Sequence, residues 1–428
     1  MTVFKKSEEW LLRAEKTIPL GSQTFSKSRT QYPVGISPLY IEKAKGSYVW
    51  DIDGNKYIDL VSALASVTLG YSDPGMNRAI RKQLKKGISF SLPGKLEAEV
   101  AEKLISIIPS AEMVRFGKNG TDATSAAVRL ARAYTGRNLV LVCGYHGWQD
   151  WYIGATTRNK GVPKNVSELT IMFPYNDLET FNEIVNSNKG KIAAVVMEPM
   201  NSTFPNPNYL EEIRRITTKE GIVLVFDETI TGFRFSNGGA QEYFGVTPDL
   251  STFGKGMANG MPLSAVVGKR DIMIEMENIF FSGTFGGELL SLAAANYVID
   301  KFVIENIPAK LNSIGVELTL KIENLISELK LNSTLSLSGH NSWKFLNWKD
   351  SFGESSLTIK TFFMQEMFAT GVLVLGTHNL NASFRKRQTQ EILDSYSSVL
   401  GRISQKLISG NLAASNKVKN LEPIFKVR

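Results

Sequence analysis

A lysine between two glycines is the residue whose local sequence best suits covalent chemistry. Lys255 lies in the stretch Ser251–Gly260, where glycines and apolar residues surround it. Removing water from an amine lowers its pKa and makes it a better nucleophile for a carbonyl carbon. A loop lysine without a chemical role is the alternative that the stretch leaves open. We therefore take Lys255 as a candidate nucleophile.

A pair of acids follows a predicted buried strand. Asp227 and Glu228 come directly after the apolar run Ile222–Phe226. An acid in this place can cap the next helix or orient a ligand. If the ligand carries a pyridine ring, a carboxylate beside the ring nitrogen keeps that nitrogen protonated, and the ring then works as an electron sink. Asp227 is therefore a candidate partner for a ring cofactor.

The stretch Gly117–Thr124 predicts a helix start that suits an anion. Alanines recur at helical spacing over Ala123–Ala133, which places Asn119, Gly120 and Thr121 at the N-terminus of the helix. Free backbone N–H groups and the helix dipole favour a phosphate there. An ordinary capped helix start is the alternative.

Alternating strands and helices would position these residues. Strands are predicted over Leu139–Val142, Ile192–Met197 and Ile222–Phe226, with helices over Leu178–Asn186 and Leu210–Lys219 between them. This alternation predicts an α/β fold with a mostly parallel sheet covered by helices on both faces.

Polar and aromatic residues follow each of the three strands. Tyr145 and His146 follow the first, Glu198 follows the second and Asp227 follows the third. Because ligands bind beyond the carboxyl ends of the strands in open α/β sheets, we expect these side chains to share one site.

The chain is predicted to have three parts. Residues 1–70 form an N-terminal segment with a small sheet, in which Asp53 and Gly54 mark a hairpin turn. Residues 71–304 form the large cofactor-binding α/β domain. Residues 305–428 form a smaller α+β domain, and residues 412–428 are interpreted as a surface tail. Further helices are predicted over 289–304, 357–370 and 389–406, and further strands over 335–338 and 372–375.

Composition excludes several classes of protein. The 428 residues carry a net charge of +8, but the cations are spread along the chain, so we expect no nucleic-acid partner. A lone cysteine, Cys143, excludes an internal disulfide and is interpreted as a small buried residue, while three histidines argue against a histidine-rich metal centre. We find neither a signal core nor a run near the roughly 20 apolar residues of a membrane span, so we expect a cytoplasmic protein with no membrane partner.

Six motifs in one order give the chain a resemblance to a known family. They are Gly120-Thr121, Tyr145–Gly147, Glu198-Pro199, Asp227–Arg234, Pro248-Asp249 and Gly254–Gly256. This order resembles the class III aminotransferases, which have the fold-type I architecture and use pyridoxal 5'-phosphate (PLP). Among them the chain resembles the glutamate-1-semialdehyde 2,1-aminomutases. The resemblance covers about residues 35–300 well and the C-terminal domain loosely.

The resemblance implies a role for each residue around the cofactor ring. Lys255 would form the Schiff base and then shuttle a proton. Asp227 would pair with the pyridine nitrogen, and Tyr145 would cover the ring face. His146 would also contact the cofactor, and Glu198 would lie near its phenolic oxygen or near the substrate.

The resemblance also implies how the phosphate is held. Gly120 and Thr121 would bind it, with Asn119 as a further donor. Thr284 would reach the phosphate of the neighbouring subunit, which implies a homodimer with shared active sites and a smaller α+β domain built from the N- and C-terminal segments.

Three departures from the aminomutase pattern concern the substrate. Trp148 stands where the pattern has histidine, and Glu288 ends a segment that usually reads Asn-Pro. No arginine aligns securely with the stretch that binds the substrate carboxylate, although Arg29 is a candidate. Trp148 and Trp151 with nearby amide and carboxylate acceptors suit a hydroxyl-rich substrate; the alternative is that the tryptophans belong to the core or an interface.

We therefore expect an aminotransferase that moves an amino group between small-molecule amines and carbonyl compounds, with a sugar derivative as one candidate. An intramolecular aminomutase is the alternative, because both enzymes use the same residues around the cofactor. Other PLP chemistry at the α-carbon and a non-catalytic PLP-binding protein are further alternatives.

Overall fold

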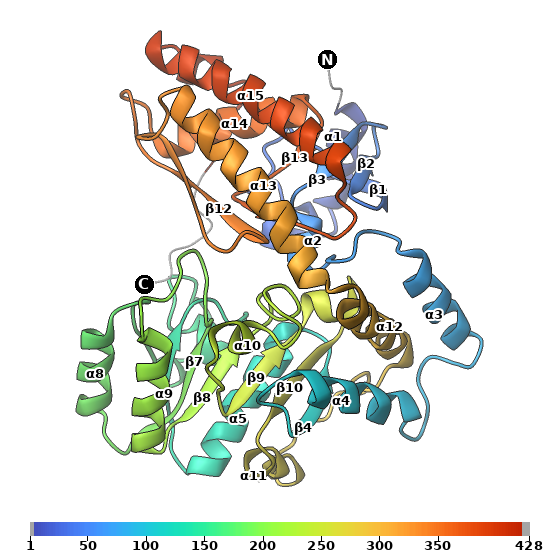
Figure 1. The fold of residues 1–428 in the computed structure, drawn as a ribbon, viewed down its shortest axis with the longest axis vertical. Coiled ribbons are helices and arrows are strands. Elements are labelled where there is room, and N and C mark those ends of the chain that lie inside the picture. The colour runs from blue at the N-terminus through green and yellow to red at the C-terminus, as the bar shows by residue number, and fades with distance from the viewer. Residues whose placement is uncertain (1–3, 422–428) are drawn as a thin grey trace. The chain divides into compact units, whose positions relative to one another are not determined.

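The computed structural model describes residues 4–421 and divides into two compact units. The first unit combines the N-terminal residues through Asp73 with the residues from Lys310 onward, and the second comprises Pro74–Ala309. Figure 1 shows the elements of each unit along the chain.

A seven-stranded sheet forms the centre of the second unit. Its strand order is β4-β10-β9-β8-β7-β5-β6. The strands are β4 (Met113–Gly117), β5 (Leu139–Cys143), β6 (Thr170–Met172), β7 (Ile192–Met197), β8 (Val223–Asp227), β9 (Leu250–Phe253) and β10 (Ser264–Gly268). Neighbouring strands from β9 to β6 are parallel, and only β10 pairs antiparallel, with β4 and β9, among the described strands of this sheet. The predicted mostly parallel sheet is confirmed.

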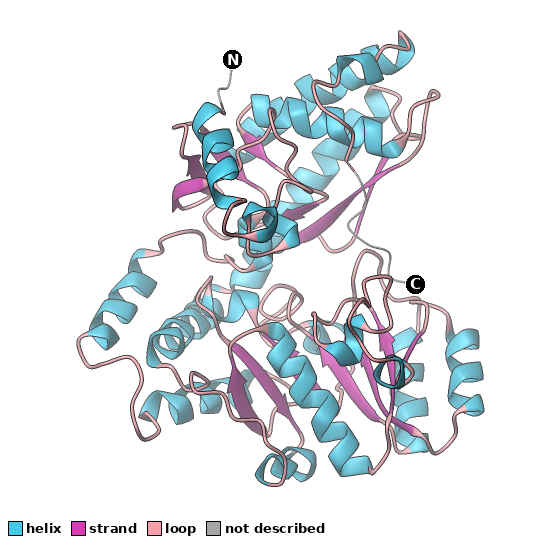
Figure 2. Cartoon of the chain, turned by 180° about the vertical axis from the view of Figure 1, so that it is seen from behind, coloured by secondary structure: helices cyan, strands magenta, loops and turns pink. Residues whose placement is uncertain are grey.

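Helices cover both faces of this sheet (Figure 2). The helices of this unit are α3 (Pro74–Leu84), α4 (Lys95–Ile107), α5 (Gly120–Thr135), α6 (Asp150–Ile153), α7 (Lys164–Ser167), α8 (Leu178–Ser187), α9 (Tyr209–Glu220), α10 (Ala240–Phe244), α11 (Arg270–Met273) and α12 (Leu289–Glu305), with short 3-10 helices at Lys255–Ala258 and Ile274–Glu277.

The strand β7 shows why both faces are buried. Ala194 and Val196 belong to the core that includes α5, whereas Val195 and Met197 belong to the core that includes α8 and α9. Successive side chains of a strand point to opposite faces, so an uninterrupted apolar run fits a strand between two helical layers. Cys143 lies in the α8–α9 core as a buried free thiol, as predicted.

The first unit contains two small sheets. One has the order β1-β2-β3-β13 and the other β11-β12-β14. The strands are β1 (Ile41–Lys45), β2 (Tyr48–Asp51), β3 (Lys56–Asp59), β11 (Leu335–Ser338), β12 (Trp343–Trp348), β13 (Val372–Leu373) and β14 (Thr377–Asn379). Its helices are α1 (Lys5–Ala14), α2 (Ser62–Ala65), α13 (Ile307–Glu328), α14 (Ser356–Ala369) and α15 (Lys386–Ile408), with 3-10 helices at Pro19–Gly21, Phe25–Lys27 and Ala413–Ser415. Because β13 pairs with β3, the N- and C-terminal segments share one sheet.

Two local features of the first unit bear on the sequence predictions. The hairpin between β2 and β3 turns at Gly54, whose φ of 91° favours glycine. The segment 412–421 is anchored on α14, because Leu421 N donates to Thr361 Oγ1 at 3.0 Å and Lys417 N donates to Gln365 Oε1 at 2.9 Å. The rest of the predicted tail, 422–428, lies outside the described residues.

Candidate active site

The carboxyl ends of four strands gather the candidate residues. Tyr145 and His146 follow β5, Glu198 follows β7, Asp227 ends β8, and Lys255 comes two residues after β9. Because β5, β7, β8 and β9 are parallel, these ends lie at one edge of the sheet. The structure therefore brings together the residues that the sequence placed at strand ends.

The carboxylate of Asp227 is buried and held by side chains on three sides. Its Oδ1 accepts from Thr229 N at 3.1 Å, from Thr229 Oγ1 at 2.5 Å and from Thr252 Oγ1 at 3.1 Å. Its Oδ2 faces His146 Nδ1 at 2.9 Å. Burial alone would raise the pKa of Asp227, but the bonds and charge of His146 and the bonds from Thr229 outweigh it and lower that pKa. Asp227 is therefore ionised.

The ring of His146 faces a hydrogen-bond acceptor at each nitrogen. Nδ1 meets the ionised Asp227, and Nε2 lies 3.1 Å from the carbonyl oxygen of Cys143. Neither acceptor can donate, so a hydrogen bond at either contact needs the proton on the ring nitrogen. The ring is buried and stacks on Trp151, with centroids 6.4 Å apart and planes 13° apart. Asp227 and His146 thus form a buried hydrogen-bonded pair.

The amine of Lys255 lies in the electrostatic reach of this pair. Burial lowers the pKa of Lys255, while the charges of Asp227 and Glu198 act against that lowering and the charge of Arg234 adds to it. Lys255 also has a φ of 41°, in the left-handed region that a non-glycine residue seldom adopts. Such strain is often found at functional sites. An amine with a lowered pKa is more often uncharged, and the uncharged amine is the form that attacks a carbonyl carbon.

Glu198 provides a carboxyl group that can exchange a proton near neutral pH. Burial raises its pKa to about 7, although the charges of His146 and Lys255 oppose this rise. Its Oε2 accepts a hydrogen bond from Tyr145 N at 3.3 Å. The pKa of Glu198 therefore lies well above that of Asp227, although Glu198 follows β7 and Asp227 ends the neighbouring strand β8.

The start of α5 can hold an anion. Asn119 is the N-cap, and Asp122 Oδ2 accepts from Asn119 N at 2.8 Å. Thr121 Oγ1 is buried and has no hydrogen-bond partner among the described residues. A Cβ at Gly147 would lie 2.4 Å from Thr121 Oγ1, so the loop that carries Tyr145 passes close to this hydroxyl. Free N–H groups of a helix start and an unpartnered hydroxyl suit a phosphate.

The aromatic residues near the site separate into two groups. The side chains of Tyr145 and Trp148 are 49% and 64% exposed. Trp151 is buried, and its Nε1 donates to Ser125 Oγ at 3.0 Å. Trp151 therefore belongs to the core beneath His146, which was one of the two alternatives for the tryptophans, while Trp148 is available for a ligand.

The remaining candidates lie in other surroundings. Thr284 is exposed in a turn that precedes α12. Glu288 caps α12 and pairs with Lys118. Arg29 belongs to the first unit, where its Nε donates to Glu15 Oε1 at 2.5 Å. Glu288 and Arg29 were candidates for substrate contacts. In the structure, the charged group of each contacts another residue of the chain instead.

Sequence reasoning did not single out Thr229, Thr252 and Lys118. Thr229 has a usable signal, because a threonine two residues after an aspartate often bonds to its carboxylate. Thr252 carries no such signal in the sequence. Its hydrogen bond to Asp227 depends on the pairing of β8 with β9, in which the two residues lie opposite each other.

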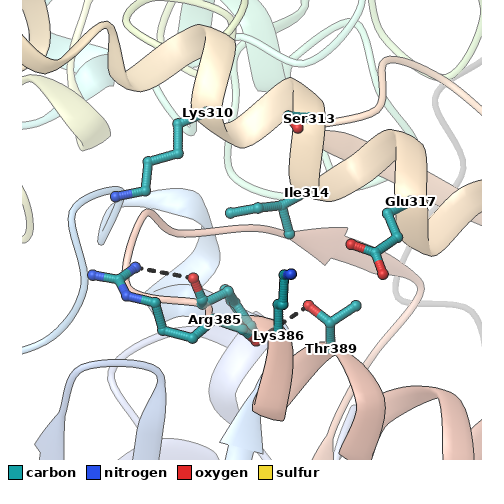
Figure 3. A pocket seen from close by; sticks show the side chains of 8 residues that line it. Lys310, Ser313, Ile314, Glu317, Arg385, Lys386 and Thr389 are labelled. Carbon is teal, nitrogen blue, oxygen red and sulfur yellow. Dashed lines mark hydrogen bonds between the residues drawn. The ribbon is translucent and has the colours of Figure 1, made fainter.

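A cavity of about 410 Å³ lies in the first unit, between α13 and the start of α15 (Figure 3). Its lining residues are Lys310, Ser313, Ile314, Glu317, Phe384, Arg385, Lys386 and Thr389. None of the candidate residues lines it. Within residues 4–421 there is no cluster of three or more His, Cys, Asp or Glu side chains suited to a metal ion. In the same range no helix is long and apolar enough to cross a membrane.

Known proteins resemble this chain over most of its length. Residues 31–385 match the family model described as Aminotransferase class-III. A glutamate-1-semialdehyde 2,1-aminomutase of Methanosarcina acetivorans is 38% identical over 349 residues, which cover 75% of this chain and 82% of that protein. A protein of the same name from Syntrophobacter fumaroxidans is 40% identical over 293 residues, 64% of this chain and 68% of that protein.

The fold is shared with solved structures. An omega-transaminase from Sphaerobacter thermophilus matches with a TM-score of 0.85 at 24% identity, over 95% of this chain and all of that chain (100%). At this level of identity the match concerns the fold alone.

Proposed function

The chain belongs to the class III aminotransferase family, and we propose that it transfers amino groups between separate amine and carbonyl substrates with Lys255 as the covalent attachment point of PLP. The family makes the chain a PLP-dependent aminotransferase or aminomutase. The observation that carries the proposed site is the buried contact of Asp227 with His146 at the sheet edge shared with Lys255.

The residues at this edge fit PLP in three respects. The amine of Lys255 has the lowered pKa needed for attack on a carbonyl group. The ionised Asp227 suits a protonated ring nitrogen. The unpartnered Thr121 Oγ1 and the N–H groups at the start of α5 suit the phosphate. When bound, PLP supplies an electron sink for negative charge at the carbon that bears the amino group.

Each residue has a distinct task in the proposed reaction. Lys255 Nζ would hold the cofactor and would also carry a proton from and to the reacting carbon of the substrate. Asp227 keeps the ring nitrogen protonated, and His146 keeps Asp227 ionised and fixed in place. Tyr145 covers the ring. Glu198 holds a proton near neutral pH beside the reacting groups.

Trp148 supports a substrate other than glutamate semialdehyde. Its exposed ring replaces the histidine of the aminomutase pattern, and Gln149 beside it offers an amide. An aromatic face with a polar neighbour suits a hydroxyl-rich carbonyl compound, so we include a sugar derivative in the proposal. Trp151 and Glu288 no longer support this choice, because contacts within the chain engage both. The relatives' names favour aminomutase activity as the second candidate.

We also propose a cytoplasmic homodimer with shared active sites. Thr284 lies in an exposed turn, next to Phe285, which is 60% exposed, and near Phe280, which is 82% exposed. Large exposed aromatic side chains are typical of surfaces that another protein covers. A second copy on this surface would bring Thr284 toward the phosphate of the neighbouring cofactor.

The test separates intermolecular from intramolecular transfer. The holoenzyme is mixed with candidate amino donors, and the visible absorbance of the cofactor is followed during one half-reaction. We expect bleaching with at least one donor and restoration by a keto-sugar. Failure of every donor to bleach the cofactor, together with efficient isomerisation of glutamate semialdehyde without a donor, would replace the transaminase proposal by the aminomutase.

A further inference from the structure

A partly buried ion pair joins the start of α5 to the start of α12. Lys118 Nζ lies 3.0 Å from Glu288 Oε2, and the two side chains are 19% and 12% exposed. Lys118 directly precedes Asn119, the N-cap of α5, and Glu288 is the N-cap of α12. The pair therefore connects the backbone at the proposed phosphate site to the turn that contains Thr284.

The carboxylate of Glu288 bonds to two elements of its own chain. Its Oε1 accepts from Leu290 N at 2.6 Å. Its Oε2 accepts from Ser291 N at 3.2 Å, from Ser291 Oγ at 2.6 Å and from Lys118 Nζ at 3.0 Å. A carboxylate offers about four acceptor positions. One of the bonds is made to Oε1 and three to Oε2, so within the chain Glu288 acts chiefly through Lys118 and α12.

Lys118 is held at both its backbone and its side chain. Its N–H donates to Asp122 Oδ2 at 3.0 Å, and its Nζ donates to Glu288. The next residue, Asn119, donates its own N–H to the same Asp122 oxygen at 2.8 Å. Movement of the Lys118 side chain would therefore be transmitted to the first turn of α5, where Thr121 and the free N–H groups lie.

We propose that Lys118 and Glu288 are positioning residues that fasten the start of α5 to the start of α12 and so set how firmly the enzyme holds the phosphate of PLP. The inference rests on the proposed function, and neither residue is assigned a contact with the cofactor. The same pair explains why this chain has Glu288 where related enzymes usually have a different residue: the acid serves Lys118 and the helix rather than substrate selection.

The direction in which PLP binding changes distinguishes a positioning role of Lys118 from a purely electrostatic one. If Lys118 acted only through its field, removing the charge of Glu288 would leave an unpaired cation near the phosphate and tighten binding. If the pair positions the helix start, loss of either partner leaves the other partly buried and unpaired, and the contact between the two helices is lost. Both single changes then weaken binding of PLP.

The experiment measures the release of PLP from the holoenzyme of wild type, Lys118→Met, Glu288→Gln and the double variant. The amide oxygen of the glutamine side chain can still cap α12, so Glu288→Gln removes the charge and spares the cap. We expect each single variant to release PLP about ten-fold faster, and the double variant to be no faster than the faster single one, as for two residues that act as a pair. Lys118→Arg should restore most of the retention.

A matched control comes from a second ion pair on α12. Lys103 Nζ lies 2.5 Å from Asp300 Oδ1, and this pair joins α4 to α12 without touching α5. Lys103→Met should change the melting temperature of the protein with no change in PLP release. A purely structural role of Lys118 would give the same pattern as this control.

Three results would overturn the inference. They are slower release from Glu288→Gln, additive effects in the double variant, and release from all variants at the wild-type rate. A wild-type protein that binds no PLP would instead refute the proposed function, so the two failures are distinguishable. If Lys118→Met yields little folded protein, the comparison of Glu288→Gln with Lys118→Arg carries the same test.

Discussion

Replacing His146 by phenylalanine removes a hydrogen-bond partner from the carboxylate of Asp227 while keeping a ring that can stack on Trp151. The bond from Nδ1 is 2.9 Å long and buried, and Asp227 keeps only the donors of Thr229 and Thr252 in its absence. A hydrogen bond to a charged group contributes about 1.5–3 kcal/mol, and about 1.4 kcal/mol corresponds to a factor of ten in rate. If that stabilisation serves the transition state, kcat/KM should fall about ten- to hundred-fold.

The pH dependence of kcat/KM should shift in one defined direction when His146 is replaced. His146 lowers the pKa of Asp227, so the wild-type carboxylate stays ionised as the pH falls until that lowered pKa is reached. Without His146 the pKa of Asp227 rises, because burial is then less opposed, and the acidic limb of kcat/KM should move to higher pH. His146→Asn retains a neutral donor and should show a smaller shift.

The assay is kcat/KM between pH 4 and 8 for the three proteins, with one amino donor found by the half-reaction screen. The melting temperature of each holoenzyme serves as the control for folding. An acidic limb that stays in place in His146→Phe, with the fold intact, would refute the argument that His146 keeps Asp227 ionised.

Three further predictions concern other titratable or unpartnered groups. Thr121→Val removes the buried hydroxyl that has no partner within the described chain, so the Kd for PLP should rise about ten-fold or more; equal affinity in an equilibrium titration would exclude Thr121 as a phosphate donor. Burial raises the pKa of Glu198 to about 7, so a spectral transition of the holoenzyme near pH 7 should disappear in Glu198→Gln, and its persistence would assign it to another group. Burial and the charge of Lys344 lower the pKa of His378 from 6.5 to about 4, so its neutral form contributes stability above pH 6.5 that is lost as the pH falls toward 4. The free energy of unfolding should fall by up to about 3 kcal/mol over this range, and by clearly less in His378→Phe, as measured by urea denaturation.

The strand-end cluster could be predicted from sequence because its physical basis is local. Each apolar run identifies a buried strand, and parallel strands end at a common edge. Asp227 and Glu198 could therefore be assigned to one edge without knowledge of the strand order. The helix start at Gly120 was equally accessible, since helical spacing and a glycine-containing turn lie next to each other in the sequence.

Contacts that depend on register or on tertiary packing could not be predicted. Thr252 bonds to Asp227 only because β8 and β9 pair in one register. Trp151 and Trp148 are close in sequence, yet one is buried and the other exposed, and no helical periodicity relates them because Trp148 lies before the four-residue helix α6. Glu288 carried a weaker signal, because an acid directly before the apolar helix at Leu289 suits the positive end of the helix dipole, although glutamate is not one of the preferred N-cap residues.

The central claim is that PLP is attached to Lys255, and borohydride reduction of the holoenzyme followed by peptide mass spectrometry tests it most directly. We expect one reduced adduct, on the peptide that contains Lys255, and no adduct in Lys255→Ala despite normal folding. An adduct on a different lysine of the wild type, or an adduct retained in Lys255→Ala, would contradict it.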